Sequence, residues 1–447
     1  MFSPALRATT SGVLVLITLV AFEAMGVAAA LPTAARDLHG LAGYGWAFTG
    51  PLVGNVVGLV VSGQLSDRRG PRLPLITGLI AFIAGLLVAG TSVNMTEFVA
   101  GRIVQGLGGG MLITAVYVVL GEMYAEQLRP KVFAAISGAW VVPALIGPLI
   151  SGFLTQHASW RWVFLGLVPF AVAGAGLIIP ALRRIRPRPA EATTRLAGAR
   201  RVLRAVAVAA GVAALEAAGQ HPNVASIAVA AAGIVALAWG LRALLPPGTL
   251  RVRPGVSAPI ALRGLIAGSF FGVDSMVPLT LTVQHRYSAL AAGVPLAASG
   301  VTWAIGAWWQ GRSGVSDRVG LIRAGLGFIA TAAAATAVVA FPGVPGWLIY
   351  GTWALAGVGA GLGMSSVGVL LLKYTTDADR GADSAALQVA DVVMASLTTG
   401  LAGVLVAAAA VGTLGYTSAF VVLDLSMAAL ALLGVVVARR ARAAPAA

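Results

Sequence analysis

The sequence predicts an all-α integral membrane protein. Of its 447 residues, 58% are hydrophobic and only 10% are charged, whereas a soluble domain carries about 25% charged residues. The mean hydropathy is +0.91. The apolar residues are gathered in runs of about 20, the length that crosses a bilayer as a helix. A soluble protein of this composition would expose far too much apolar surface.

The apolar runs predict fourteen membrane-spanning helices. They lie at approximately 11–32, 43–63, 73–92, 96–121, 131–156, 162–182, 202–219, 223–245, 258–284, 291–311, 321–341, 346–372, 384–411 and 416–438. The seventh is the weakest prediction because it is short, rich in alanine and carries Glu216 near one end. The first has no clear cleavage site, so we expect a retained helix and not a signal peptide.

The placement of charge predicts which helix ends face the cytoplasm. With the N-terminus inside, alternation through the spans leaves 26 of the 30 Lys and Arg residues on the cytoplasmic side. Arg36, Arg161 and Arg286 lie outside, and Arg102 lies within a span. Cytoplasmic segments carry such a basic excess. We therefore interpret the net charge of +15 as a topology signal and not as a nucleic-acid surface, and we expect both termini in the cytoplasm.

One short pattern occurs twice. Ser-Asp-Arg-x-Gly stands at 66–70 and again at 316–320, 250 residues later. Each copy follows the second helix of a six-helix set if the seventh and eighth helices are an insertion. The sequence therefore predicts an N-terminal six-helix bundle over 1–183, a basic linker with two additional helices over 184–257, and a C-terminal six-helix bundle over 258–447. Duplicated halves around a site at the membrane midplane are typical of secondary transporters.

Several charged residues fall inside predicted helices, where charge is costly and usually functional, and three of them, Glu23, Asp274 and Arg102, are the candidates for proton coupling. A carboxylate at Glu23 costs at least about 2.5 kcal/mol unless it is protonated, hydrated or paired, so Glu23 is a candidate proton carrier. The alternative is a static partner of Arg102. Asp274, in the first helix of the second half, is the second candidate, with a helix cap or structural hydrogen bond as the alternative. Arg102 stays charged, and we expect it to tune these acids or to anchor its helix.

Six further residues are candidates for contact with a substrate. Aromatic and methionine side chains suit the wall of an apolar pocket, and two polar residues join them. These candidates are Asn55, Trp140, Phe271, Trp303, Met364 and Asp391. Plain packing or lipid contact is the alternative for the apolar members, and an interfacial position is the alternative for Asp391.

Five strings then carry a family resemblance. They are GQLSDRRGPR at 63–72, RIVQGLGGG at 102–110, FEAMGVAAALP at 22–32, WRWVF at 160–164 and GPLISG at 147–152. They resemble motifs of the major facilitator superfamily, and specifically of its fourteen-helix drug:proton antiporter branch. In the fifth predicted helix the residues that the antiporter signature implicates are Pro143, Gly147, Pro148 and Gly152.

The resemblance implies two six-helix bundles that work by alternating access. It implies proton-coupled export of lipophilic or amphipathic compounds, as in multidrug efflux and antibiotic resistance. It also draws attention to the repeated cytoplasmic motif, whose aspartates can accept hydrogen bonds from a facing helix and pair with arginine. A latch of this kind would bias a two-state equilibrium. The expected latch residues are Gly63, Asp67, Arg68, Gly70, Asp317, Arg318 and Gly320. A basic loop that only satisfies topology is the alternative.

Other functions have less support. Export or flipping of a lipid or hydrophobic natural product is the main alternative, whereas a membrane-embedded transferase lacks a polar donor domain and a channel lacks a pore motif. We expect no enzymatic activity and no cofactor, because neither Lys131 nor Lys373 follows the glycine of a phosphate loop. We expect no metal site, because the chain has no cysteine and its four histidines lack ligand-spaced partners. The expected partners are protons, a lipophilic or lipid-like substrate and the bilayer, without nucleic acid, for a monomer in a bacterial plasma membrane.

Overall fold

The structure is entirely helical in the part of the chain that it describes. This computed structural model describes residues 7–123, 129–182, 195–220, 223–311, 317–376 and 379–442. The first half contains α1 (Arg7–Gly26), α2 (Leu31–Asp37), α3 (Trp46–Arg69), α4 (Arg72–Thr91), α5 (Met95–Met123), α6 (Arg129–His157), α7 (Trp162–Leu165) and α8 (Leu167–Leu182). Next come α9 (Arg195–Gln220) and α10 (Val224–Leu244). The second half contains α11 (Ser257–Asp274), α12 (Val277–Val283), α13 (Ala289–Gln310), α14 (Arg318–Val339), α15 (Leu348–Tyr374), α16 (Arg380–Ala410) and α17 (Tyr416–Val437).

Twelve helices in the described ranges are long and apolar enough to cross a membrane. The other two expected spans correspond to α6, which has 29 residues, and to α7 with α8, whose described apolar stretch Trp162–Ile178 is shorter than 18 residues. Helix α6 packs against α1 and α13, and α8 packs against α1 and α4. An all-helical multi-pass membrane protein is thereby confirmed, with twelve spans established by length and composition.

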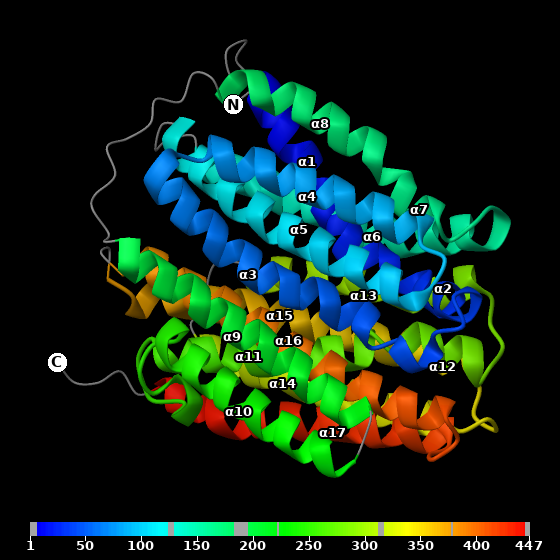
Figure 1. Cartoon of the computed structure of the whole chain (residues 1–447). Helices are drawn as coiled ribbons and strands as arrows, with labels where there is room; N and C mark the ends of the chain where they lie inside the picture. Colours follow the sequence, from blue (N-terminus) through cyan, green and yellow to red (C-terminus); the bar gives the residue numbers. More distant parts are fainter. Residues whose placement is uncertain are drawn as a thin grey trace.

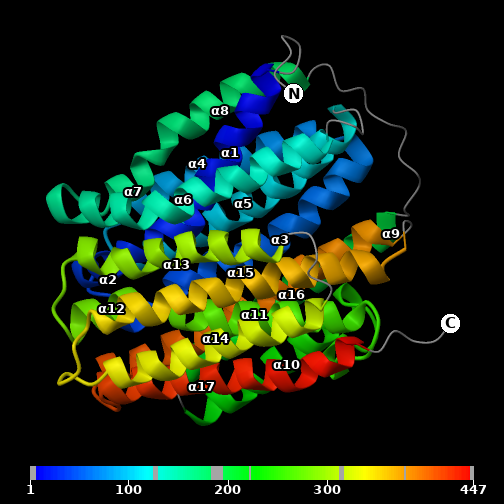
Figure 2. The same cartoon turned by 180° about the vertical axis from the view of Figure 1, so that it is seen from behind.

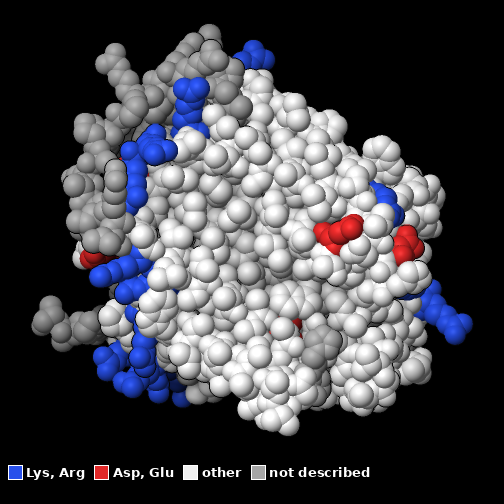
Figure 3. Space-filling view, viewed as in Figure 1, with Lys and Arg blue, Asp and Glu red and all other residues white. Residues whose placement is uncertain are grey.

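The helices lie side by side in two groups, with the first half above the second in Figures 1 and 2. Helix α9 packs against α10, and it also contacts α3 of the first half and α16 of the second. Helix α1 begins and α17 ends at the same end of the bundle, and lysine and arginine side chains gather there beside a broad uncharged band (Figure 3). We call this end the basic end, and the opposite end, where α2, α7 and α12 lie, the distal end.

The first helix of each half is broken at a matching place. Helix α1 ends at Gly26, and a 3-10 turn leads into α2, which has Pro32 in its first turn. Helix α11 ends at Asp274, and α12 follows with Pro278 in its first turn. The prediction of continuous helices over 11–32 and 258–284 was wrong in this respect. Proline lacks the N–H of a helix interior but suits a first turn, so each proline starts a new short helix.

The two halves also share a tight helix crossing. Gly110 of α5 lies against the backbone carbonyl of Asn55 in α3, and Gly361 of α15 lies against the backbone carbonyl of Trp303 in α13. An added Cβ atom would collide with the carbonyl in both places. Small residues allow this close approach of membrane helices. The crossing of the first half therefore occurs again in the second half.

Two boundaries differ from the sequence prediction. Helix α3 was expected to end near Gly63 but continues to Arg69, because neither proline nor glycine occurs between Gly63 and Gly70, whose φ of 73° favours glycine. Helix α9 is longer than the expected 202–219, because it begins at Arg195 in a stretch rich in the helix formers Ala, Leu and Arg. Part of the basic stretch at 183–194, His221, and residues 313–316 of the second motif copy lie outside the described residues.

Candidate functional site

A narrow cleft lies where the two halves meet. Its first-half wall comes from α1 and α6, and its second-half wall comes from α11 and α13. The lining residues are Met25, Ala144, Pro148, Phe270, Asp274, Leu296, Ser299 and Trp303. This wall is mostly apolar, and it contains one carboxyl group, that of Asp274. Walls of this kind are usual for small-molecule sites, but in this conformation the cleft has room for about one water molecule and not for a drug-sized compound.

Asp274 is held by a tryptophan in the neighbouring helix. The Trp353 indole N–H donates a hydrogen bond of 2.7 Å to one carboxylate oxygen of Asp274. Trp353 is fully buried, and its ring stacks on Phe270 with centroids 5.1 Å apart. Asp274 is the last residue of α11, directly before the helix break. The break thus places an acid at the end of a helix, and α15 orients its side chain.

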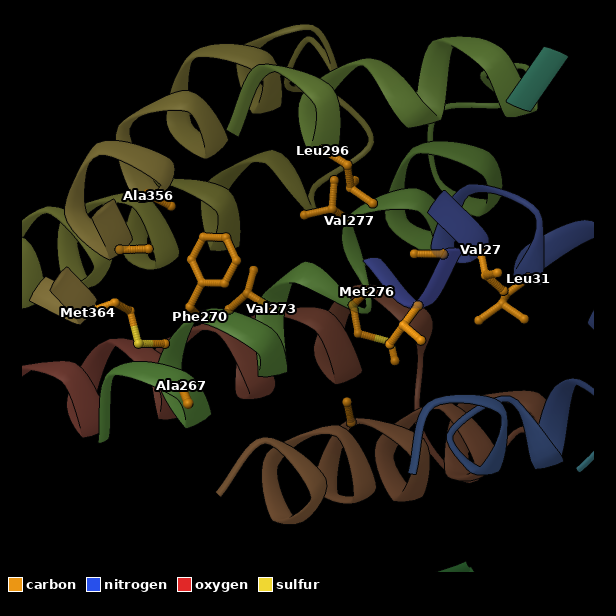
Figure 4. Packing of buried hydrophobic residues seen from close by; sticks show 14 of the residues in the cluster. Val27, Leu31, Ala267, Phe270, Val273, Met276, Val277, Leu296, Ala356 and Met364 are labelled. Atoms are coloured by element: carbon orange, nitrogen blue, oxygen red, sulfur yellow. The ribbon is translucent and has the colours of Figure 1, made fainter. Parts of the chain in front are cut away.

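An aromatic cluster forms the wall beside this acid. Phe270 meets the Trp303 ring edge to face at 5.3 Å, and it meets Phe271 in the same way at 5.2 Å. Figure 4 shows Phe270 pointing from α11 toward α15, near Ala356 and Val273. Perpendicular rings of this kind attract one another beyond their buried area. The cluster therefore gives the cleft a fixed aromatic face.

Glu23 and Arg102 form a buried ion pair between α1 and α5. Their side chains are only 11% and 5% exposed. Arg102 also donates a 3.1 Å hydrogen bond to the backbone carbonyl of Ala47 and a 2.7 Å hydrogen bond to the Gln105 side chain. Glu23 lies two residues before Met25 of the cleft wall. The structure brings these two predicted residues together, whereas Asp274 has a different partner.

The string at 160–164 packs around this pair. The Arg102 guanidinium lies 5.7 Å from the centre of the Phe164 ring. Phe164 contacts Phe98 edge to face, and Phe98 contacts Trp160 in the same way. The Trp160 indole N–H donates to the Asp37 carboxylate at 2.9 Å. The sequence analysis noted this string only as a resemblance, and its contact with Arg102 depends on tertiary packing.

Two of the six predicted substrate-binding residues belong to the cleft or its wall. Trp303 lines the cleft, and the Phe271 ring lies 6.3 Å from the Trp303 ring. Asn55 lies at the crossing of α3 and α5, with its amide near Gly109. Trp140 is half-buried on α6 and is not among the residues that line the cleft. Substrate contact at these four positions stays a prediction.

The other two predicted binding residues surround an arginine that the sequence analysis did not single out. Arg263 of α11 forms an ion pair with Asp391 of α16 at 2.7 Å. It also donates to the backbone carbonyl of Met364 in α15 at 3.3 Å. Both charged side chains are mostly buried. Arg263 therefore connects α11 to α15 and α16, and contact of Asp391 or Met364 with a substrate stays a prediction.

Two of the four antiporter-signature residues of α6 contact helix α13 of the second half. Pro148 lines the cleft, and its carbonyl lies against Gly293 of α13. Gly147 lies against Gly26, where α1 ends. Gly152 lies against the backbone of α13 at 289–290. The fourth residue of this set, Pro143, is buried one turn away in the same helix.

The second copy of the repeated motif caps a helix. Asp317 is the N-cap of α14 and accepts a 2.8 Å hydrogen bond from the backbone N–H of Gly320. Asp317 also forms an exposed ion pair with Arg442 at 2.7 Å. Arg318 donates to the backbone carbonyl of Gln310 at 2.7 Å. These contacts join α14 to α13 and to the C-terminal turn.

The first copy of the motif lies beside the start of α9. Asp67 and Arg68 lie exposed on the last turn of α3, and Gly63 has open space beside it. Arg68 and Gln64 lie against Gly198 at the start of α9. The two copies therefore have different surroundings, and the latch stays a prediction. Among the described residues, His, Asp and Glu form no group of three or more that could hold a metal ion.

Glu216 is the residue that the sequence analysis undervalued. It was treated as a weakness of the seventh span, but the structure buries it to 2% exposure between α3 and α16. The sequence did indicate its importance, because a carboxylate within an apolar membrane-spanning run has a high free-energy cost and is usually functional. Trp353, which holds Asp274, had no comparable signal in the sequence.

Comparisons with known proteins agree with this architecture. A "Probable multidrug-efflux transporter" of Mycobacterium tuberculosis is 28% identical over 398 residues, which cover 84% of this chain and 82% of that protein. An "Acurin A biosynthesis cluster MFS-type transporter" of Aspergillus aculeatus is 33% identical over 36% of this chain and 29% of that protein. The "Multidrug transporter protein MdtP" of Bacillus subtilis is 32% identical over 36% of this chain and 30% of that protein. The last two alignments thus span less than a third of the relative.

The fold comparison and the family comparison cover most of the chain. The crystal structure of an auto-inhibited POT family peptide transporter superposes on 97% of this chain and 98% of that chain, with a TM-score of 0.69 and 16% identity. At this identity the likeness concerns the fold alone. The family model described as Major Facilitator Superfamily matches residues 13–398. The chain therefore belongs to the Major Facilitator Superfamily, a family of membrane transporters.

Proposed function

We propose that this protein is a proton-coupled secondary transporter that exports lipophilic or amphipathic compounds by alternating access. The observation that carries the proposal is the cleft between the halves, which combines the Asp274 carboxyl with the aromatic face of Phe270 and Trp303. An acid in an apolar cavity attracts cationic or neutral amphipathic compounds. The multidrug-efflux name of the relative that aligns over most of the chain supports this substrate class.

In this proposal the acids of the two halves have different tasks. Asp274 lines the cleft, so a substrate that enters there competes with a proton for it. Glu23 is paired with Arg102 beside the cleft, and this pair opens when α1 moves against α5. Moving one proton through 100 mV supplies about 2.3 kcal/mol, which sustains a roughly 50-fold gradient of a neutral substrate exchanged one for one.

The proposal includes the topology. Helix α6 and the α7–α8 pair complete fourteen spans, with both termini in the cytoplasm of a bacterium and the protein in its plasma membrane. The N-terminal bundle at 1–183 and the C-terminal bundle at 258–447 are the moving bodies, and 184–257 is the insertion. The gathering of basic side chains at the end where α1 begins and α17 ends supports this orientation (Figure 3). We propose that the protein works as a monomer.

Transport by purified protein in liposomes tests this function. An imposed pH gradient should drive accumulation of lipophilic cations such as tetraphenylphosphonium, and each addition of substrate should release protons. Glu23→Gln and Asp274→Asn should each abolish the driven component. If labelled phospholipid moves between leaflets while no lipophilic compound produces a proton signal, the protein is the exporter or flippase of a lipid-like compound that the sequence left as the alternative.

A further inference from the structure

The inserted helix α9 places a buried carboxyl group in the seam between the two halves. Glu216 is 2% exposed, and one of its carboxylate oxygens lies against Gly45, at the start of α3, and against Gly403 of α16. Gly45 and Gly403 also contact each other directly through their backbones. A residue of the insertion therefore sits where the first half touches the second half at the distal end.

The polar contacts of Glu216 come from neutral groups. Gln220 donates to one carboxylate oxygen at 3.2 Å, and the Thr49 hydroxyl bonds the same carboxyl group. The second carboxylate oxygen, Oε2, is buried without a hydrogen-bond partner. Gln220 also accepts a 2.8 Å hydrogen bond from the Trp46 indole, which ties α9 to α3. None of the ion pairs among the described residues includes Glu216.

The helices packed around Glu216 bring no charge close to it in the described part of the chain. The charged residues of α3, α9, α10 and α16 are Asp67, Arg68, Arg69, Arg195, Arg200, Arg201, Arg204, Arg242, Arg380, Asp383 and Asp391. Along α16, the nearest of them is Asp391, eight residues from Thr399, or about 12 Å at 1.5 Å per residue. Thr399 is level with Glu216, because its hydroxyl lies 3.4 Å from that of Thr49. On α9 itself the nearest is Arg204, about 18 Å away.

Such a seam favours a neutral carboxyl group over an ionised one. A buried charge without a counter-ion costs several kcal/mol, and a buried oxygen without a partner adds to the cost. Separation of α3 from α16 would admit water to the ionised group and remove most of this cost. The charge on Glu216 therefore opposes the closed seam, and a proton on Glu216 favours it. A group that distinguishes two conformations in this way shifts their populations.

We propose that Glu216 is a third proton-coupling residue, which closes the distal seam between the halves when it is protonated and favours opening when it loses the proton. The inserted helix is then part of the transport machinery and not a spacer. Helix α9 also reaches Gln64 and Arg68 through Gly198, so the same helix contacts α3 near both of its ends. The inference rests on the proposed proton-coupled exchange, in which uptake of a proton from the distal side would return an emptied transporter to the closed form.

Spin-label distances across the seam test the inference. The chain has no cysteine, so Val93→Cys and Val411→Cys, at exposed positions of the distal end, provide two unique labelling sites. We expect a longer distance to gain population as the pH rises in the otherwise wild-type protein in nanodiscs. In Glu216→Gln the two labels should stay at the short distance at every pH. In Glu216→Asp the distance should still lengthen as the pH rises. An unchanged pH response in Glu216→Gln, or no response in the wild type, would overturn the inference.

Two controls keep the outcome decisive. If Glu216→Gln does not fold, Thr49→Val removes the hydroxyl that bonds the carboxyl group, and an unchanged midpoint of opening would overturn the inference. Substrate-triggered proton release is measured on the same preparations. If the distal seam opens independently of Glu216 while substrate still triggers proton release, only this inference is wrong. If the wild type releases no protons on substrate binding but the distal seam still opens in a manner that depends on Glu216, the proposed antiport is wrong and the role of Glu216 in the seam stands.

Discussion

Arg102 forms an ion pair with Glu23, a residue 79 positions earlier in the chain, and both side chains are nearly excluded from solvent. The pair joins α5 to α1 directly beside the cleft. It stabilises two charges that the membrane interior would otherwise disfavour. The pairing with Arg102 that the sequence suggested for Glu23 is therefore present, and its role as a proton carrier stays a prediction.

Removal of one member of this pair should lower the stability of the fold more than removal of both members. Arg102→Met leaves the Glu23 carboxylate buried without its cation, and breaking a buried pair in this way costs about 3–5 kcal/mol. The double variant Glu23→Gln with Arg102→Met should recover most of that loss. Thermal unfolding in detergent, followed by intrinsic fluorescence, measures both. A double variant as unstable as Arg102→Met would show that Arg102 acts through its other contacts.

Trp353→Phe should impair coupling while it leaves the fold intact. The variant removes the indole donor to Asp274 but keeps a ring that can stack on Phe270. A hydrogen bond to a charged group contributes about 1.5–3 kcal/mol, so substrate-triggered proton release should slow by about tenfold or more. Trp347→Phe is the control, because Trp347 is 60% exposed at a distal helix end. Equal effects of the two substitutions would contradict a role for the Trp353 donor.

Two glycines of α5 should respond differently to the same small change. A Cβ atom at Gly106 would collide with the backbone of Pro51, whereas one at Gly109 would have no neighbour closer than 4.0 Å. Gly106→Ala should therefore destabilise the protein by about 1–3 kcal/mol, the usual effect of overpacking, and Gly109→Ala should be neutral. Size-exclusion profiles and melting temperatures measure the difference. Similar melting temperatures would mean that α3 and α5 are less closely packed than described.

We predict that the Asp317 side chain stabilises the protein mainly as the N-cap of α14. Asp317→Ala removes the oxygen that bonds the Gly320 N–H and should cost about 1 kcal/mol. Asp317→Asn keeps a capping oxygen, and Arg442→Ala removes only an exposed pair worth about 0–1 kcal/mol. Melting temperatures should fall mainly in Asp317→Ala. Normal stability of Asp317→Asn with lost transport would instead favour the latch.

Much of the fold could be predicted from the sequence because a membrane imposes a simple rule. Apolar runs long enough to cross the bilayer must be helical, and the positions of most helices follow from this rule. The broken first helices of the two halves could also be predicted, because Pro32 ends the first apolar run and Pro278 interrupts the ninth. The sequence analysis gave those prolines too little weight.

The site was less accessible to prediction because it depends on which helices meet. Glu23 and Asp274 were recognised by their charge alone, but their partners Arg102 and Trp353 follow from tertiary packing. Glu216 carried the same charge signal, yet its position in the seam depends on the docking of α9 between α3 and α16. No local pattern encodes that docking.

Proton release on substrate binding tests the central claim most directly. Purified protein in weakly buffered detergent solution is titrated with tetraphenylphosphonium while a pH-sensitive dye reports released protons. We predict release that saturates with binding in the wild type and is lost in Asp274→Asn, with Trp347→Phe behaving as the wild type. Saturable binding of the cation with no proton release in the wild type would contradict a cleft in which substrate and proton compete.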